Sequence, residues 1–325
     1  MPVFTATAPG KIILFGEHAV VYGRAAIAVP VEQVRARAIL SPNPRGESGE
    51  ILIQAPDVGL ETALKNLPDD HPIARAVWSV VHKLGVIRLP ACTIRITSSI
   101  PVASGLGSGA AVSVAVIRAL SIFLGKPLPD EIVSELAFEV ERIYHGTPSG
   151  IDNTVITYAM PVYFVREEPI EVLQLPEPFT IVIADTGIRS PTSATVGDVR
   201  QGWQVNRQLY ERIFDQIGQI AIRARYIIEN GEPWRLGKLL NENHRYLRQL
   251  NVSSPELDHL VQIAQEAGAL GAKLSGGGRG GNMIALVEPG SAQRVSNRLL
   301  EHGAVGVMVT TVRSTLDLDS SWLGG

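Results

Sequence analysis

The sequence predicts an α+β fold with two domains. The chain has 325 residues, which is about twice the length of an average domain. Strand-like and helix-like segments are mixed in the first half, without the regular strand–helix alternation of a parallel sheet. From about Thr195 onward, long amphipathic helices dominate. With 45% hydrophobic and 19% charged residues the chain can pack a core, which excludes disorder, collagen and a coiled coil.

The first half contains both kinds of element. Runs rich in β-branched residues predict five strands, at residues 33–40, 50–54, 92–96, 162–165 and 180–184. Apolar residues at helical spacing predict three helices, at residues 72–84, 110–124 and 129–144.

The second half is mainly helical. Its apolar spacing predicts helices at residues 196–228, 233–250, 255–267 and 291–301. Strands at residues 283–287 and 305–312 flank the last of these helices. A proline-rich stretch at residues 167–178 predicts a boundary between domains 1–172 and 173–325.

Charge and cysteine content exclude several classes of partner. The 29 basic and 32 acidic residues give a net charge of −3, which supplies no general attraction to nucleic acid or anionic membrane. The single Cys92 excludes an internal disulfide and a multi-cysteine zinc site, and fits a reducing cytosol. The apolar stretch 110–124 contains Arg118 and is shorter than the ~20 residues of a membrane span. We therefore expect a cytoplasmic protein with neither nucleic-acid nor membrane partners.

The most informative of three glycine-rich segments is residues 98–111, between a predicted strand and a predicted helix. Glycine allows positive φ and close backbone approach, so successive N–H groups at a helix N-terminus can bind phosphate. The pattern Gly105-x-Gly107-x-x-Ala110 also satisfies the relaxed dinucleotide fingerprint. However, Asp130, about 20 residues on, opens a helix instead of ending a strand, which argues against a Rossmann fold.

The other two segments hold polar groups or glycines in unusual surroundings. Half of residues 273–282 are glycine, a density that costs backbone entropy and indicates a ligand or tight backbone packing. Residues 8–23 embed Lys11, Glu17 and His18 in an apolar stretch, where an unpaired buried charge is expensive. These three side chains should face a pocket or one another. The alternative is a surface hairpin with Lys11 and Glu17 paired in solvent.

A fourth segment, residues 139–153, supplies two carboxylates. Phosphoryl transfer needs oxygen ligands for Mg²⁺, a group that orients or deprotonates the acceptor hydroxyl, and a cation near the transferred group. Glu141, Ser108, Asp152 and Lys11 have the required chemistry. Taken alone, Asp152 is equally well explained as a helix N-cap and Glu141 as a solvated helix end.

The three glycine-rich segments in this order, with the Pro-Ser-Gly-Ile-Asp-Asn turn at 148–153 between the second and third, resemble the GHMP small-molecule kinases. The resemblance covers residues 3–287, and residues 9–23 are most similar to the members that phosphorylate mevalonate. It implies a two-domain α+β fold with an N-terminal domain like the second domain of ribosomal protein S5 and a ferredoxin-like C-terminal domain. ATP and Mg²⁺ would bind in the cleft between the domains, and the family suggests a homodimer.

The resemblance also implies roles for individual residues. Asp152 corresponds to the catalytic base and Lys11 to its charged neighbour, and Ser108 and Glu141 correspond to the Mg²⁺ ligands. The residues matching the mevalonate site are Lys11, Glu17, His18, Asp152 and Thr192. Those matching the ATP-binding loops are Pro101, Ser104, Gly105, Leu106, Gly107, Ser108, Gly109, Ala110, Gly277 and Gly278. The implied reaction converts ATP and mevalonate into ADP and 5-phosphomevalonate.

The chain departs from the family pattern at three positions. Gly109 replaces the usual second serine of the phosphate loop, Arg279 interrupts the later glycine run, and Asn282 stands where cysteine is common. We expect Arg279 to face solvent, the alternative being a contact with phosphate.

Other activities remain as alternatives. Phosphomevalonate kinase shares the N-terminal segment but needs extra basic residues for the substrate phosphate, whereas galactokinase and homoserine kinase differ around Glu17 and His18. A related decarboxylase uses the same loops. Because Lys11 and Glu141 are both present, the decarboxylase is disfavoured. Together with Asp152 they also disfavour a non-catalytic sensor, since they supply every charged role of the transfer.

Overall fold

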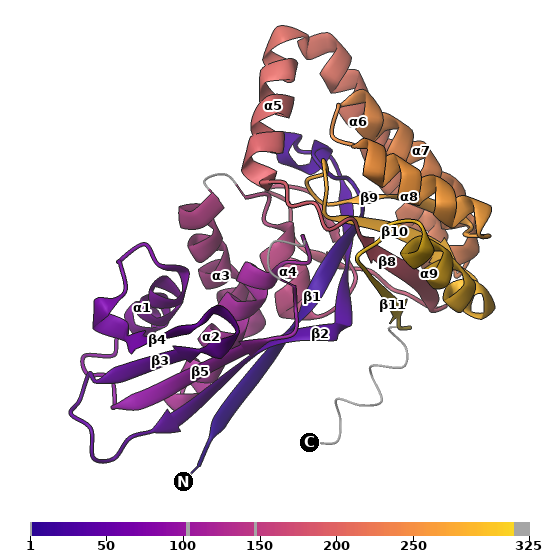
Figure 1. The fold of residues 1–325 in the computed structure, drawn as a ribbon. Coiled ribbons are helices and arrows are strands. Elements are labelled where there is room, and N and C mark those ends of the chain that lie inside the picture. Colours follow the sequence, from indigo (N-terminus) through magenta and orange to yellow (C-terminus); the bar gives the residue numbers. More distant parts are fainter. Residues whose placement is uncertain (1, 102–104, 146–147, 315–325) are drawn as a thin grey trace. The chain divides into compact units, whose positions relative to one another are not determined.

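The computed structural model describes residues 2–101, 105–145 and 148–314, which form two compact units (Figure 1). The first unit comprises residues 2–10, 32–101 and the described part of 107–159. The second comprises residues 11–31, 105–106 and 160–314. The chain passes between the units several times, and the domain boundary at residue 172 stays a prediction.

The first unit combines a sheet with four helices. Its strands are β1 (Phe4–Phe15), β2 (Ala26–Pro42), β3 (Ile51–Ala55), β4 (Leu60–Ala63) and β5 (Cys92–Ser98). Strands β1 and β2 pair with each other and continue into the second unit. Strand β5 pairs antiparallel with β2 and parallel with β3, and β3 pairs antiparallel with β4. The helices are α1 (Pro72–Leu84), α2 (Ser108–Phe123), α3 (Asp130–His145) and α4 (Ile151–Tyr158).

Helix α2 is the centre of the helical layer. It packs against α1, α3 and α4 and against strand β5. Ten of its residues are buried, and several of these are alanines, which allow the neighbouring helices to approach closely. The N-terminus of α2 is therefore held in a fixed position within the first unit.

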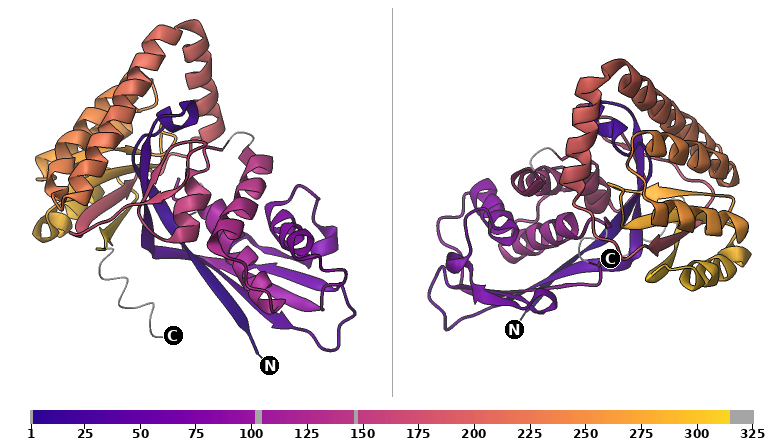
Figure 2. Two further views of the ribbon diagram at one scale, coloured as in Figure 1. Left: turned by 180° about the vertical axis from the view of Figure 1, so that it is seen from behind. Right: turned by 45° about the horizontal axis from the view of Figure 1, so that its top comes forward.

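The second unit is built on a four-stranded antiparallel sheet in the order β11-β8-β10-β9. These strands are β8 (Phe179–Asp185), β9 (Gly271–Ser275), β10 (Asn282–Val287) and β11 (Gly306–Val312). Helices α7 (Leu236–Gln249) and α8 (Pro255–Glu266) pack on β9, while α9 (Ala292–Glu301) packs on β8 and β11 and touches α8 (Figures 1 and 2). The three helices therefore cover one face of the sheet.

The remaining elements of the second unit extend this core. Helix α6 (Arg207–Glu229) packs on α7 and on α5 (Thr192–Val205), and β6 (Val162–Phe164) pairs with β2 and with β7 (Glu171–Val172). Among the described residues, the short 3₁₀ helices are η1 (Ala19–Tyr22), η2 (Pro56–Val58), η3 (Leu64–Asn66), η4 (Pro233–Arg235) and η5 (Pro289–Ser291). In the part of the chain that the structure describes, no helix is long and apolar enough to cross a membrane.

Most predicted elements are confirmed, and two differences have clear physical reasons. The single helix predicted over 196–228 is wrong, because Asn206 has a non-helical φ of −135° and its side chain accepts a hydrogen bond from the N–H of Leu209, which ends α5 and caps α6. Helix α4 was not predicted because its eight residues are too few to show helical periodicity.

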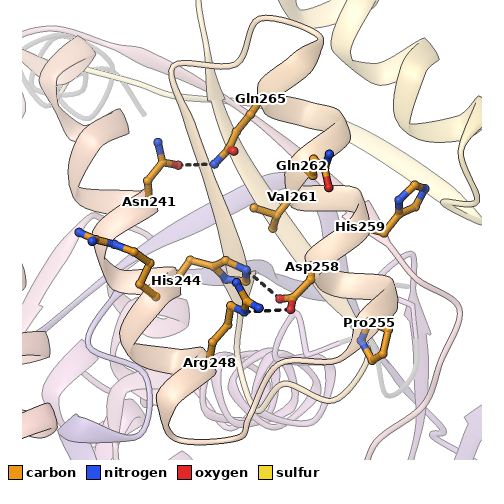
Figure 3. A pocket seen from close by; sticks show the side chains of 10 residues that line it. Asn241, His244, Arg248, Pro255, Asp258, His259, Val261, Gln262 and Gln265 are labelled. Carbon is orange, nitrogen blue, oxygen red and sulfur yellow. Dashed lines mark hydrogen bonds and ion pairs between the residues drawn. The ribbon is translucent and has the colours of Figure 1, made fainter.

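A buried histidine joins α7, α8 and β9. The backbone N–H of Leu274 donates to Nδ1 of His244 (3.3 Å), so Nε2 carries the proton and donates to Oδ1 of Asp258 (3.0 Å). The hydroxyl of Ser253 also donates to this carboxylate. Arg248 forms an ion pair with it (Figure 3). Burial is the main reason that the pKa of His244 falls from 6.5 to about 4, although Asp258 opposes the shift.

Acidification should destabilise the protein through His244. The unfolded chain takes up this proton near pH 6.5 and the folded chain only near pH 4. The contribution of His244 to the free energy of unfolding should therefore fall by about 3 kcal/mol as the pH drops through this interval. Urea unfolding at several pH values measures this slope. In His244→Gln, which can still donate to Asp258 but does not titrate, the slope should be smaller, and parallel curves for the two proteins would contradict the assignment.

Candidate active site

The N-terminus of α2 faces a buried carboxylate in the first unit. Gly107, with φ +77°, is the N-cap of α2, and Ser108 and Gly109 form its first turn. A Cβ on residue 109 would lie 3.4 Å from Oε1 of Glu141, whose side chain comes from α3 and is 8% exposed. The alternative of a solvated helix end for Glu141 is therefore wrong. Its negative charge lies where the helix dipole favours an anion.

The donor set at this helix end suits magnesium. A serine hydroxyl and a carboxylate supply the oxygen ligands that Mg²⁺ prefers, and this ion is commonly bound by one or two carboxylates together with substrate phosphates. Residues 2–101, 105–145 and 148–314 contain no cluster of three or more histidine, cysteine or acidic side chains arranged to hold a metal ion. The oxygen atoms of Ser108 and Glu141 fit the ligand preference of magnesium. Gly109 adds no second hydroxyl.

Asp152 lies in the first turn of α4, one residue beyond the first helical position. The N-cap is Gly150, with φ +91°, so the alternative of Asp152 as the N-cap is wrong. The hydroxyl of Thr154 donates to the carbonyl of Gly150 (2.8 Å) and fixes this turn. Because α4 packs on both α2 and α3, the structure brings Asp152, Ser108 and Glu141 onto three helices of one packed group.

Lys11 and part of the predicted phosphate-binding loop lie in the second unit. Lys11 is in β1 and only 4% exposed, and its backbone N–H donates to the carbonyl of Leu106 (2.9 Å). Leu106 is itself buried, whereas Pro101 and Gly105 are exposed. Ala110, in the first turn of α2, is buried in the first unit. Ser104, which was predicted to bind ATP, lies outside the described residues.

The segment after β1 turns sharply and is buried. Gly16 has φ +98°, and a Cβ there would lie 2.5 Å from Ala26, so only glycine fits. Glu17 is 1% exposed and pairs with the ammonium of Lys273. His18 is 6% exposed and donates through Nε2 to the carbonyl of Gly277 (3.0 Å). The surface hairpin with a solvent-exposed Lys11–Glu17 pair is therefore wrong.

Burial controls the ionisation of this turn. It lowers the pKa of His18 from 6.5 to about 4, so the imidazole is neutral near pH 7. Burial also raises the pKa of Glu17 and lowers that of Lys273, while the attraction between the two charges opposes both shifts. Lys11 lowers the pKa of Glu17 as the smallest of the opposing causes.

The glycine-rich loop after β9 packs backbone against backbone. A Cβ on Gly278 would lie 1.9 Å from the carbonyl oxygen of Val252, and one on Gly280 would lie 2.4 Å from that of Ile188. A Cβ on Gly277 would meet the exposed Thr192 of α5 at 2.9 Å from its hydroxyl oxygen. Tight packing thus accounts for several of these glycines, while their predicted contact with ATP stays a prediction.

Comparison with known proteins identifies the family. Residues 71–160 match the model of the GHMP kinases N terminal domain, and residues 225–305 match that of the GHMP kinases C terminal domain. The chain belongs to the GHMP kinase family.

Relatives within the GHMP kinases are similar over nearly the whole chain. A mevalonate kinase of Pyrococcus horikoshii is 36% identical over 337 residues, covering 97% of each chain. One of Thermococcus gammatolerans is 38% identical over 302 residues, covering 86% of this chain and 88% of the relative. The crystal structure of L. major mevalonate kinase in complex with R-mevalonate has a TM-score of 0.82 at 33% identity and covers 96% of both chains.

Arg279, which interrupts the glycine-rich loop, is bound to its neighbours on several sides. Its guanidinium pairs with Asp198 of α5 and donates through Nε to the carbonyl of Asn251 (3.1 Å). Its backbone has φ +58° and donates to the carbonyl of Val252 (2.8 Å). The side chain is therefore only partly exposed, and its ion pair joins the glycine-rich loop to α5.

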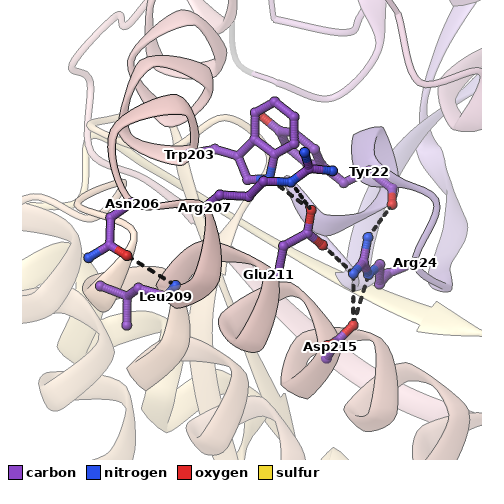
Figure 4. Close-up of polar contacts among 8 residues, drawn as sticks. All are labelled: Tyr22, Arg24, Trp203, Asn206, Arg207, Leu209, Glu211 and Asp215. Atoms are coloured by element: carbon purple, nitrogen blue, oxygen red, sulfur yellow. Dashed lines mark hydrogen bonds and ion pairs between the residues drawn. The ribbon is translucent and has the colours of Figure 1, made fainter.

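A cluster of polar and aromatic side chains fixes the far end of the buried turn. The guanidinium of Arg24 donates to Glu211 and Asp215 of α6 and to the carbonyl of Tyr22 (Figure 4). Tyr22 stacks on Phe214, with ring centroids 4.2 Å apart. The segment that follows His18 is therefore anchored on α6.

Sequence reasoning gave no role to Lys273. It stands in β9 with apolar neighbours on both sides, and a lysine at such a position needs a buried anion. That pattern was the available signal. By contrast, the cavity of about 590 Å³ between α7 and α8 contains none of the predicted site residues (Figure 3).

Alanine substitutions in the glycine-rich loop should separate backbone conformation from packing. Gly276 and Gly278 both have positive φ, but only Gly278 has a backbone atom in the place of a Cβ. Gly276→Ala should cost about 1–2 kcal/mol, the strain of a left-handed backbone. Gly278→Ala should cost a further 1–3 kcal/mol, approximately, from overpacking against Val252. Urea unfolding measures both, and equal losses would show that the packing contact is not limiting.

Proposed function

We propose that this GHMP kinase transfers the γ-phosphoryl group of ATP to the primary hydroxyl of mevalonate, giving ADP and 5-phosphomevalonate. The observation that carries the proposal is the 36% identity to a mevalonate kinase over 97% of both chains. The solved relative at 33% identity contains R-mevalonate, and its fold covers 96% of this chain. The Ser108 hydroxyl at the start of α2 and the neighbouring Glu141 carboxylate of α3 have the chemistry that phosphoryl transfer requires.

The nucleotide phosphates would bind at the N-terminus of α2. The first N–H groups of a helix have no partner within it, and their dipoles favour an anion. In this chain they belong to Ser108, Gly109 and Ala110. A net charge of −3 supplies no general attraction, so a local device of this kind is needed. The remaining proposed ATP contacts are Pro101, Ser104, Gly105, Leu106, Gly107, Gly277 and Gly278.

Magnesium would be held by the Glu141 carboxylate and the Ser108 hydroxyl. When bound with ATP it would neutralise charge on the phosphates. The burial of Glu141 beside the first turn of α2 supports this assignment, because it fixes the carboxylate before the nucleotide arrives. Because Gly109 has no Cβ, space remains next to the carboxylate of Glu141.

Asp152 would orient the primary hydroxyl and accept its proton as the new oxygen–phosphorus bond forms. Lys11 would stabilise negative charge near the acceptor. Mevalonate would be positioned by the turn that contains Glu17 and His18, and by Thr192. A neutral His18 suits this role, because with Nε2 donating to Gly277 its other ring nitrogen is a hydrogen-bond acceptor.

The proposal also includes a cytoplasmic location and a homodimer, the latter suggested by the family. Cys92 supports the first part. Burial raises the pKa of its thiol to about 11, so it is protonated and inert at neutral pH, and it has no disulfide partner in this one-cysteine chain.

Substrate identity should be tested by ADP release with four alcohols in parallel. We expect turnover with mevalonate, and at least about 100-fold lower kcat/KM with phosphomevalonate, galactose and homoserine. Magnesium chelation should abolish the reaction. A higher kcat/KM for any of the other three alcohols would replace mevalonate as the proposed substrate.

The role of Asp152 predicts a selective loss of turnover. Asp152→Asn should lower kcat by about 10²–10⁴-fold, because the amide accepts no proton, while KM for ATP stays within about twofold. Steady-state kinetics with mevalonate and ATP measures both constants.

The matched control for this variant is Asp130→Asn. Asp130 also stands in the first turn of a helix, α3, and pairs with Arg118, so the control carries the same change in charge at a helix N-terminus. It should keep wild-type turnover. An Asp152→Asn enzyme within about tenfold of wild type would mean that another group is the base.

A further inference from the structure

Strand β9 presents a polar face to the start of the chain. Side chains alternate along a strand, so Lys273 and Ser275 lie on one face and Ala272 and Leu274 on the other. Ala272 and Leu274 belong to the hydrophobic core of the second unit. The two polar residues instead contact the β1 segment and the turn that follows it.

These contacts recur at every second residue. The ammonium of Lys273 donates to Oε1 of Glu17 and to the carbonyl of Leu274. The hydroxyl of Ser275 donates to the carbonyl of Ile13 (2.9 Å) and accepts from its N–H (3.2 Å). The carbonyl of Gly277 accepts from His18. Residues 13–18 thus lie beside β9 and the start of the glycine-rich loop, and these contacts hold the two segments together.

Only one of these attachments is a pair of charges. Lys273 is 0% and Glu17 1% exposed, and Oε2 of Glu17 has no hydrogen-bond partner within the described ranges. Replacing a buried ion pair with apolar side chains is often neutral or stabilising, whereas removing one partner leaves a buried charge unpaired. Stability alone therefore explains the Glu17–Lys273 ion pair poorly. Its effect is to hold the turn after β1 in one position.

We propose that Lys273 is a positioning residue for substrate binding, acting through Glu17 on the turn that contains Glu17 and His18. This inference rests on the proposed function, in which that turn contacts mevalonate. The described hydrogen bonds of Lys273 go to Glu17 and to the backbone carbonyl of Leu274, so its proposed effect on the substrate is indirect. Its ammonium keeps Glu17 in place, and the turn then holds His18 in an unusual backbone conformation, with φ +62° and ψ −47°.

The backbone of the turn supplies a direct readout. The N–H groups of Ala19, Val20 and Val21 donate to the carbonyls of Glu17, Gly16 and His18. If Lys273 fixes the turn, its loss should loosen these hydrogen bonds and speed their hydrogen exchange. Peptides that cover residues 13–22 report this exchange by mass spectrometry without any ligand.

The kinetic test is a double-mutant cycle with Lys273→Met, Glu17→Gln and the double variant. Lys273→Met should raise KM for mevalonate by about tenfold or more, with KM for ATP within about twofold. In the Glu17→Gln background the same substitution should change KM for mevalonate by less than about twofold, because Lys273 acts through Glu17. The double variant should unfold at a higher temperature than Lys273→Met, since no unpaired charge remains.

The matched control is Arg223→Met. It breaks the exposed Arg223–Glu242 pair between α6 and α7, which lies in the same unit. This control should change neither KM nor the exchange of residues 13–22. A role of Lys273 in folding alone would lower the amount of folded protein and leave KM for mevalonate unchanged.

The outcomes separate the two proposals. If the wild type does not use mevalonate, the proposed function fails, and the exchange experiment alone decides whether Lys273 fixes the turn. If the wild type uses mevalonate, unchanged KM in Lys273→Met overturns the inference. Unchanged exchange of residues 13–22, or an equal effect of Lys273→Met with and without Glu17→Gln, also overturns it.

Discussion

The structure depends on a buried ion pair between Glu17 and Lys273. In the second unit, the turn after β1 and the glycine-rich loop after β9 are arranged around this pair. One charge belongs to the turn after β1 and the other to the strand that leads into the glycine-rich loop. Neither can be removed alone without leaving the other buried and unpaired. The pair therefore locks together segments that are more than 250 residues apart in sequence, Glu17 and Lys273 being separated by 256 positions.

The other contacts of the glycine-rich loop require glycine at particular positions, because the backbone of the loop lies so close to neighbouring backbone atoms. Gly278 and Gly280 have carbonyl oxygens in the space of a Cβ, and Arg279 between them bonds to Val252 and Asp198. In the first unit the constraint is different. There the small residues of α2 allow α3 and α4 to pack closely against it, and this packing positions Glu141 of α3 and Asp152 of α4. One unit thus positions side chains by helix packing, the other by loop packing.

Most of the helices could be predicted from the sequence, because apolar periodicity is a local signal. The resemblance to a kinase family could be recognised for the same reason, since it depends on local glycine-rich segments. The sequence did not predict the partner of Glu17. An ion pair between distant residues leaves no local pattern, and Lys273 is marked only by its apolar neighbours. The break at Asn206 was missed for a related reason, since helical periodicity continues on both sides of a single capping residue. Gly278 was expected to face a ligand or a backbone, and only the structure shows the carbonyl of Val252.

The central claim is that one phosphoryl group moves from ATP to the primary oxygen of mevalonate. The most direct measurement is ³¹P NMR of the product formed by the wild-type enzyme from mevalonate, ATP and magnesium. We expect one phosphomonoester whose phosphorus couples to two methylene protons, in an amount equal to that of the ADP released. A phosphorus signal without proton coupling, as expected for the tertiary oxygen, or ADP released with free phosphate alone, would contradict the account.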